Sequence, residues 1–151
     1  MLTRWRNLKV GLVILFILAS CNSVAKPDPN AIKPSKPGGT GEALRLNGLA
    51  DQGELVFNSK CKECHGEAGQ GGILNPGVES GEVPALNPID ASLYNSDAKV
   101  FAANIDLFIE HGSTPEGTNP KNVMDAWGDN KKLTPQQIAD VIAYIIALNK
   151  Q

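Results

Sequence analysis

The segment from Cys61 to His65 holds the residues whose types and spacing are most typical of a chemical role. It reads Cys-Lys-Glu-Cys-His, so a histidine directly follows the second of two closely spaced thiols. A Cys-x-x-Cys-His run is typical of covalent haem attachment, because each thiol can form a thioether with one vinyl group of the porphyrin. The adjacent imidazole is then placed to bind the iron. The segment predicts one haem c per chain, attached through Cys61 and Cys64, with His65 as an axial ligand.

Other uses of this segment fit the rest of the sequence less well. A structural zinc site needs a second pair of Cys or His residues, whereas the chain has three Cys and two His in all, and the third Cys is Cys21. A thioredoxin-like dithiol requires a strand–helix–strand setting, and no buried strand is predicted around Cys61. A disulfide between Cys61 and Cys64 leaves the adjacent histidine without a role. Haem attachment is the interpretation that uses all three side chains.

Residues 1–20 are predicted to be an export segment. Three basic residues come first: Arg4, Arg6 and Lys9. The apolar run over residues 10–19 is too short to span a bilayer. Residues 18–21 read Leu-Ala-Ser-Cys and resemble a bacterial lipobox, which implies a lipoprotein-type signal peptide and lipidation of Cys21. The alternative is an ordinary signal peptide or an uncleaved anchor; either version places the domain in the periplasm or another extracytoplasmic space.

The charge of the exported chain is acidic. Residues 1–20 hold three of the 14 basic residues and none of the 16 acidic ones, so 11 basic and 16 acidic residues remain, a net charge near −5. Haem propionates add further negative charge. This balance disfavours nucleic acid as a partner and favours a basic or mixed docking surface on another redox protein at the outer face of the membrane.

Residues 21–47 are predicted to be a lipidated, flexible tether. Between residues 26 and 41 the chain has four prolines, three glycines and few apolar side chains, so this stretch has no means of building a core. The remaining residues, 48–151, suit one small domain.

Two helices are predicted on either side of the central loops. The first covers about residues 49–59, directly before the haem-binding segment. The second runs from a cap at Ser96 to about residue 110, and Gly112 is the expected stop. Apolar residues form one face of this second helix: Val100, Phe101, Ile105, Phe108 and Ile109.

The last helix has the clearest local signals. Thr134 is the expected N-cap, Pro135 occupies the first helical position and Gln137 completes a capping-box pattern. An apolar stripe at helical spacing then continues to about residue 148: Ile138, Val141, Ile142, Ile145 and Ile146.

The chain between the helices is predicted to be mostly loop. Residues 66–81 contain six glycines and one proline, and a short helix is expected over residues 89–94. No segment alternates with a period of two residues, so the fold is predicted to be all-α.

The segment from Gly53 to Leu148 resembles class I c-type cytochromes. In that family a glycine and an aromatic residue precede the haem-binding segment by eight and four positions, and Gly53 and Phe57 match both. A partner aromatic residue lies on the last helix, and Tyr144 matches it. The resemblance implies a small cytochrome c fold, with three to five helices around one covalently bound haem and with the first and last helices crossing at Gly53.

The same resemblance implies a partner for the haem histidine. The family has a Pro-x-Leu segment after the haem-binding residues, and its proline carbonyl accepts the Nδ1 proton of the histidine. Residues 84–86, Pro-Ala-Leu, are the best match. A hydrogen bond from His65 to Pro84 is therefore expected, and it would orient the imidazole and raise its basicity.

Met124 is the predicted second axial ligand. It is the one methionine after residue 20, and residues 124–128 resemble the Met-x-x-aromatic-Gly run that supplies the distal sulfur in the family. Asp125 stands where the family usually has proline. The alternative is that Met124 only fills space in the core.

His111 is the other candidate nitrogen ligand. It lies at the end of the second predicted helix, where a histidine interacts with the last carbonyls and the helix dipole. Ligation by His65 and His111 instead would lower the reduction potential, because a thioether stabilises ferrous iron.

These features predict one-electron transfer by a lipid-anchored monohaem cytochrome c, not an enzyme, in a respiratory or photosynthetic chain. Its form is a mobile carrier or a haem subunit of a membrane oxidoreductase complex. The alternatives are a ligand-binding or peroxidatic haem protein with an open distal site, and an adhesion or scaffold lipoprotein without haem. Asp125 is the only motivation for an open distal site.

Overall fold

A computed structural model describes residues 24–150 of the chain. Its elements, in order, are η1 (Glu42–Arg45), α1 (Ala50–Lys60), α2 (Lys62–His65), η2 (Glu67–Gly69), α3 (Ala98–His111) and α4 (Pro135–Leu148). The described residues form no strand longer than an isolated bridge, so the predicted all-α fold is confirmed. No helix within residues 24–150 is long and apolar enough to cross a membrane.

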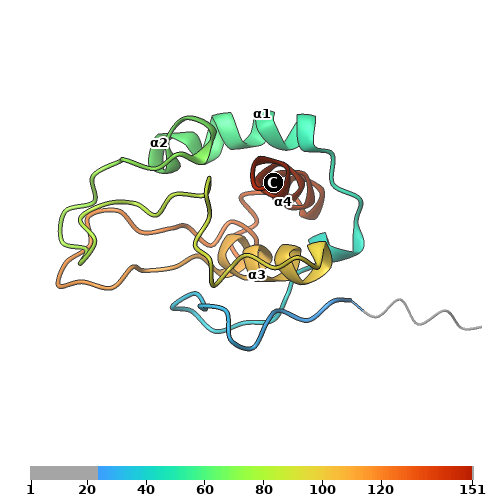
Figure 1. Ribbon diagram of the computed structural model, residues 1–151, viewed down its shortest axis with the longest axis horizontal. Helices are drawn as coiled ribbons and strands as arrows, with labels where there is room; N and C mark the ends of the chain where they lie inside the picture. Colours follow the sequence, from blue (N-terminus) through green and yellow to red (C-terminus); the bar gives the residue numbers. More distant parts are fainter. Residues whose placement is uncertain (1–23, 151) are drawn as a thin grey trace, which may run out of the picture.

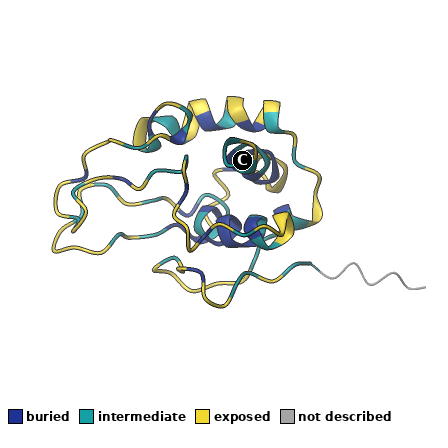
Figure 2. Cartoon of the chain, viewed as in Figure 1, coloured by how far each residue is buried: buried dark blue, intermediate teal, exposed yellow. Residues whose placement is uncertain are grey.

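The last helix forms the centre of the molecule. Figure 1 shows α4 end-on between α1 and α3, and Figure 2 shows that buried residues (dark blue) are concentrated on α3 and α4. The N-terminus of α4 has both bonds of the capping box: Thr134 Oγ1 accepts from Gln137 N, and Gln137 Oε1 accepts from Thr134 N. The apolar stripe of α4 is buried, with Ile138 1 % exposed. The predicted last helix is thus confirmed, cap included.

The crossing of α1 and α4 depends on one glycine. A Cβ atom added at Gly53 would lie 1.9 Å from the carbonyl oxygen of Asp140 and 2.9 Å from Cβ of Tyr144. Beside this contact the rings of Phe57 and Tyr144 pack with centroids 5.3 Å apart. The glycine and the aromatic pair therefore fix how closely, and at which register, the two helices cross.

Two details of the predicted helices are wrong. The side chain that caps α3 belongs to Asp97, which accepts from Lys99 N, and not to Ser96. Residues 89–94 form turns and no helix. Asp90 explains the second difference, because its side chain accepts from both the backbone and the hydroxyl of Ser92 and so favours a local turn over a helical ladder.

The described part of the predicted tether, residues 24–47, is packed against the domain instead of extending from it. Ala31 and Ala43 belong to the hydrophobic core. Backbone N–H groups of the segment donate to buried carboxamide and carboxylate groups of α3, from Asp28 to Asn104 Oδ1 (2.8 Å) and from Gly41 to Asp106 Oδ2 (2.7 Å). Hydrogen bonds to polar side chains of α3 thus hold this segment on the domain, although its own composition offers little apolar surface to bury. Cys21 and the predicted signal peptide, residues 1–20, lie outside the described residues.

Candidate functional site

The two thiols and the histidine of the Cys61–His65 segment lie on one turn of helix. Cys61 is both the C-cap of α1 and the N-cap of α2, and the N–H groups of Cys64 and His65 donate to its carbonyl oxygen at 3.1 and 2.9 Å. Both thiols are free; that of Cys64 is exposed. Burial, with the neighbouring Cys64, raises the pKa of Cys61 to about 11, so this thiol is protonated at neutral pH.

The imidazole of His65 is oriented by a backbone carbonyl. Its Nδ1 atom lies 3.0 Å from the carbonyl oxygen of Pro84. A carbonyl only accepts, so Nδ1 carries the proton and Nε2 of the neutral ring has a free lone pair. Burial lowers the pKa of His65, although the bond to Pro84 opposes this effect. A neutral ring with an available Nε2 is what an iron ligand requires.

A tight loop brings Pro84 to the histidine. Gly71 N donates to the His65 carbonyl oxygen at 2.8 Å, and the Gly69 carbonyl oxygen accepts from Leu86 N at 2.7 Å. Gly71 has φ +75°, and a Cβ atom there would lie 3.0 Å from Cβ of Ala85. The left-handed backbone and the close approach both favour glycine at this position. The glycines after the motif therefore hold the 84–86 segment beside His65.

Met124 lies on a separate segment that is anchored to the end of α3. Ser113 and Met124 exchange two backbone hydrogen bonds, of 3.1 and 2.8 Å. The Met124 side chain is half-buried and packs against the hydrophobic core. Gly112 permits the close approach, because a Cβ atom there would lie 2.5 Å from the Met124 carbonyl oxygen.

The 66–81 loop is fastened to the segment that carries Met124. The carboxamide of buried Asn75 donates to the Asn122 carbonyl oxygen and accepts from Asn122 N, each at 2.8 Å. Lys121 N also donates to the Pro76 carbonyl oxygen at 3.0 Å. Figure 1 shows the two loops side by side at the α2 end of the molecule. The sequence analysis did not predict this role for Asn75. The available signal was a single carboxamide side chain among glycines and apolar residues.

The comparisons with known proteins identify the domain. A family model described as cytochrome c oxidase, cbb3-type, subunit III matches residues 48–145. The chain belongs to this family. No curated protein and no solved structure matches the chain. The resemblance to c-type cytochromes is thereby confirmed, and with it a cytochrome c domain that implies haem c and haem-based electron transfer.

The donor set of this cytochrome c domain fits a haem. Two free thiols are spaced for the two vinyl groups, and His65 Nε2 is available for iron. The neighbouring loops present apolar side chains that are unusually exposed for their size, with Leu74 69 % and Val123 57 % exposed. Such side chains suit contact with a porphyrin. Figure 1 places both loops at the end of the cytochrome domain that carries α2.

His111 does not join this site in the cytochrome domain. Its Nδ1 lies 2.9 Å from Asp129 Oδ2, and its Nε2 lies 2.7 Å from the Gly39 carbonyl oxygen. Both partners are acceptors, so both ring nitrogens donate and the ring is an imidazolium that links residue 39 to α3. No ring nitrogen is left for iron, which disfavours ligation by two histidines.

Proposed function

We propose that the chain is a membrane-tethered monohaem cytochrome c that passes one electron at a time to and from partner proteins. In this proposal Cys61 and Cys64 hold the haem covalently, His65 and Met124 are the axial ligands, and Cys21 carries the lipid. The observation that carries the proposal is the bond from His65 Nδ1 to the Pro84 carbonyl oxygen, at the end of a turn that bears both thiols. A histidine in this geometry is prepared to bind iron.

The residues of the chain have separate tasks in this function. When bound, the haem supplies an iron that changes oxidation state by one electron. Pro84 orients His65 and increases its electron donation through the Nδ1 bond. The Met124 thioether would be the second ligand of the iron, and a thioether favours the ferrous state. The bonds from Ser113 and Asn75 hold the Met124 segment in place, so the site changes little between the two oxidation states.

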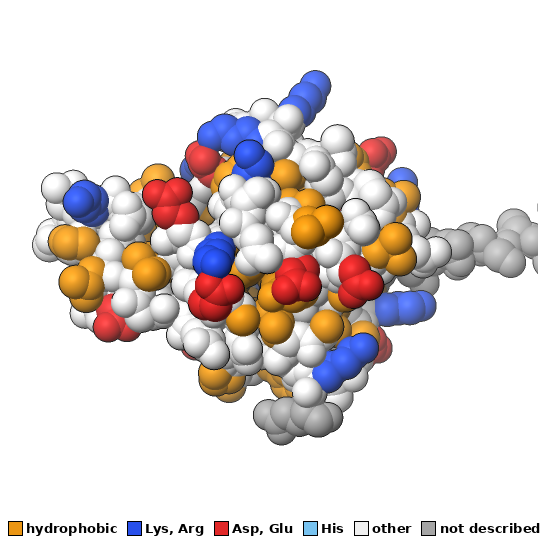
Figure 3. Space-filling model, turned by 90° about the horizontal axis from the view of Figure 1, so that it is seen from above, with side chains coloured by type: hydrophobic (Ala, Val, Ile, Leu, Met, Phe, Trp, Pro, Cys, Tyr) orange, Lys and Arg blue, Asp and Glu red, His pale blue; other side chains and the backbone are white. Residues whose placement is uncertain are grey.

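The surface beside the haem-binding turn supports a protein partner of mixed or basic charge. Figure 3 looks down on α1 and α2 and shows acidic, basic and hydrophobic side chains interspersed there. The acidic residues outnumber the basic ones: Asp51, Glu54, Glu63 and Glu67 against Lys60 and Lys62. Such a surface favours transient, salt-sensitive encounters.

The family favours the subunit form of the proposal over a free carrier. The matched model is described as subunit III of a cbb3-type cytochrome c oxidase, a complex with partner subunits. We therefore favour a haem subunit of a membrane oxidoreductase complex, in a respiratory chain.

Mass spectrometry of the mature protein, with potentiometric titration, tests the proposal. We expect one covalent haem per chain, a lipid on Cys21 and a one-electron Nernst slope. The Cys61→Ala and Cys64→Ala variants should each lose one thioether and the double variant all covalent haem. A protein without covalent haem contradicts the proposal. Recovery of only a small monomer after mild detergent extraction would contradict the subunit form and leave the carrier form.

A further inference from the structure

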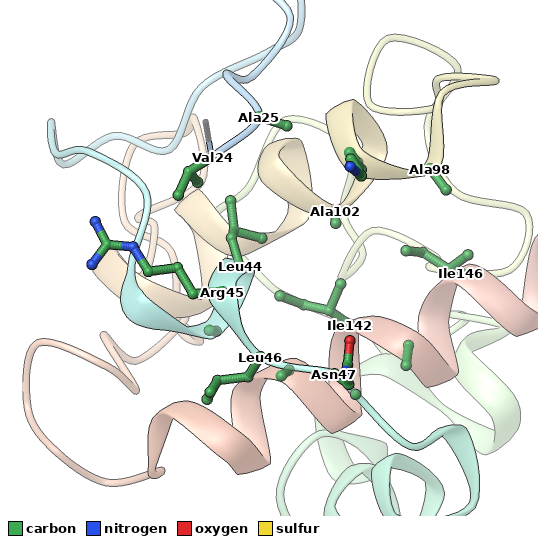
Figure 4. A pocket seen from close by; sticks show the side chains of 15 residues that line it. Val24, Ala25, Leu44, Arg45, Leu46, Asn47, Ala98, Ala102, Ile142 and Ile146 are labelled. Atoms are coloured by element: carbon green, nitrogen blue, oxygen red, sulfur yellow. The ribbon is translucent and has the colours of Figure 1, made fainter. Parts of the chain in front are cut away.

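An apolar cavity of about 530 Å³ lies between the N-terminal segment, η1, α3 and α4. Figure 4 shows side chains from all four entering it. The apolar lining includes Val24, Leu44, Leu46, Ala102, Ile142 and Ile146. None of the residues that we assign to the haem lines it. The cavity is therefore a second surface feature that the haem site does not account for.

The ionisable side chains that line this cavity are basic, whereas the whole protein has a net negative charge. Fifteen residues line it, and the two ionisable ones, Arg45 and Lys99, are both basic and exposed. The whole chain has a net charge of −2. An apolar cavity with a basic rim fits a surface that has acyl chains beneath anionic headgroups.

The proposed lipidation site lies close to the cavity along the chain. Val24 lines the cavity and lies three residues after Cys21, the lipidation site of the proposed function. Three residues span at most about 11 Å, at about 3.6 Å per residue. Because residues 24–47 are packed against the domain, this short distance replaces the long tether that composition predicted.

We propose that the cavity face, from Val24 through Arg45 and Leu46 to Lys99, rests on the lipid membrane, an inference that depends on the proposed lipidation of Cys21. In Figure 1 the described chain starts at the lower right (blue), whereas α2 lies at the upper left, on the other side of α4. In the proposed orientation the haem-binding turn is therefore on the side of the domain away from the bilayer. Redox partners reach it from the aqueous side, and a donor dissolved within the membrane does not.

Single cysteines test this orientation. In the holoprotein the three natural cysteines carry lipid or haem, so one introduced thiol is the only reactive one. Leu46→Cys probes the cavity rim; Leu55→Cys, on α1, is the matched control, since Leu46 is 41 % and Leu55 62 % exposed. The readout is the alkylation rate by a water-soluble maleimide, on vesicles of phosphatidylcholine and phosphatidylglycerol and in a soluble Cys21→Ser form exported without lipid.

We expect vesicles to slow alkylation at position 46 on the order of tenfold, because interfacial segments insert several ångströms into the headgroup layer, and to leave position 55 unchanged. Reversing Arg45 and Lys99 to Glu in the Leu46→Cys background should restore the rate on these anionic vesicles, since each basic residue contributes about fivefold to binding an anionic surface. On vesicles of phosphatidylcholine alone this reversal should have little effect.

The outcomes separate the two proposals. Protein that fails to float with vesicles contradicts lipidation of Cys21, and the orientation with it. Protein that floats with equal rates in both settings at position 46, or with slowing at position 55, overturns the orientation alone.

Discussion

The Nδ1 atom of His65 lies 3.0 Å from the carbonyl oxygen of Pro84, a residue 19 positions later in the chain. Pro84 itself is exposed, so its contribution is the position of this carbonyl and not the burial of its ring. The rigid φ angle of proline limits how far the carbonyl can move.

Replacement of Pro84 by glycine keeps the backbone carbonyl group but allows it to move more freely. Loss of part of the bond should reduce electron donation by His65 and raise the midpoint potential by about 20–40 mV, since about 1 kcal/mol corresponds to about 43 mV for one electron. Spectroelectrochemical titration measures this shift. Pro29→Gly, at an exposed proline of the N-terminal segment, should leave the potential unchanged. A lower potential in Pro84→Gly would contradict the role of the carbonyl.

Replacement of Gly53 by alanine should separate α1 from α4. The new Cβ atom would lie 1.9 Å from a backbone oxygen, which no side-chain rotation relieves. We expect a loss of about 3 kcal/mol or more in the free energy of unfolding, measured by denaturant titration. Gly39→Ala is the control, because a Cβ atom there meets nothing within 4 Å. Equal stability of the two variants would show that the helices do not cross as described.

Asp106→Asn should change how stability depends on pH. Burial raises the pKa of Asp106 to about 6, while the bond from Gly41 N lowers it; one carboxylate oxygen has no partner. Because the folded pKa lies above the ordinary value, stability is fully present below about pH 4 and falls as pH rises to about 6. The variant should lack this fall and be up to about 3 kcal/mol more stable at pH 7. Unfolding titrations of the wild type and the variant at about pH 4 and at pH 7 measure this difference. A variant that loses the same stability at both pH values would refute the prediction.

His111→Gln should release the N-terminal segment. Burial lowers the pKa of His111, but the bonds to Asp129 and Gly39, with Glu110 nearby, outweigh burial and raise it. The contribution of the imidazolium to stability is therefore complete below about pH 6.5 and is lost as pH rises through the folded pKa.

Thermolysin cleavage before Ile32, which is 49 % exposed, is the measurement for this variant. Between pH 6.5 and 9 the wild type should be cleaved faster as pH rises, after correction for the protease's own pH dependence on a free peptide. The variant should be cleaved rapidly throughout. A wild-type rate without this dependence would mean that His111 does not hold the segment.

Local signals and family spacing predicted much of this cytochrome domain. Thr134 and Gln137 specify the start of α4 within four residues, so the sequence alone identifies it. Gly53, Phe57 and Tyr144 form the contact at which α1 and α4 cross, and their positions match the family pattern. The contact between His65 and Pro84 was predicted only through that resemblance, because loop geometry alone does not determine it.

The packed N-terminal segment was not predictable from its own composition. Its prolines and glycines build no core, and it is held by acceptors elsewhere in the chain. Asn104 and Asp106 interrupt the apolar face of α3, and buried polar residues need partners. That interruption was the available signal. It indicates that a segment binds there but not which one.

The optical spectrum of the ferric protein is the decisive test for a haem whose iron is bound by both His65 and Met124. We predict the weak near-infrared charge-transfer band of a thioether sulfur on ferric haem in the wild type. Met124→Ala should lose this band, bind carbon monoxide in the ferrous state and keep its covalent haem. A wild type that lacks the band and binds carbon monoxide readily would contradict the account and favour an open, ligand-binding site.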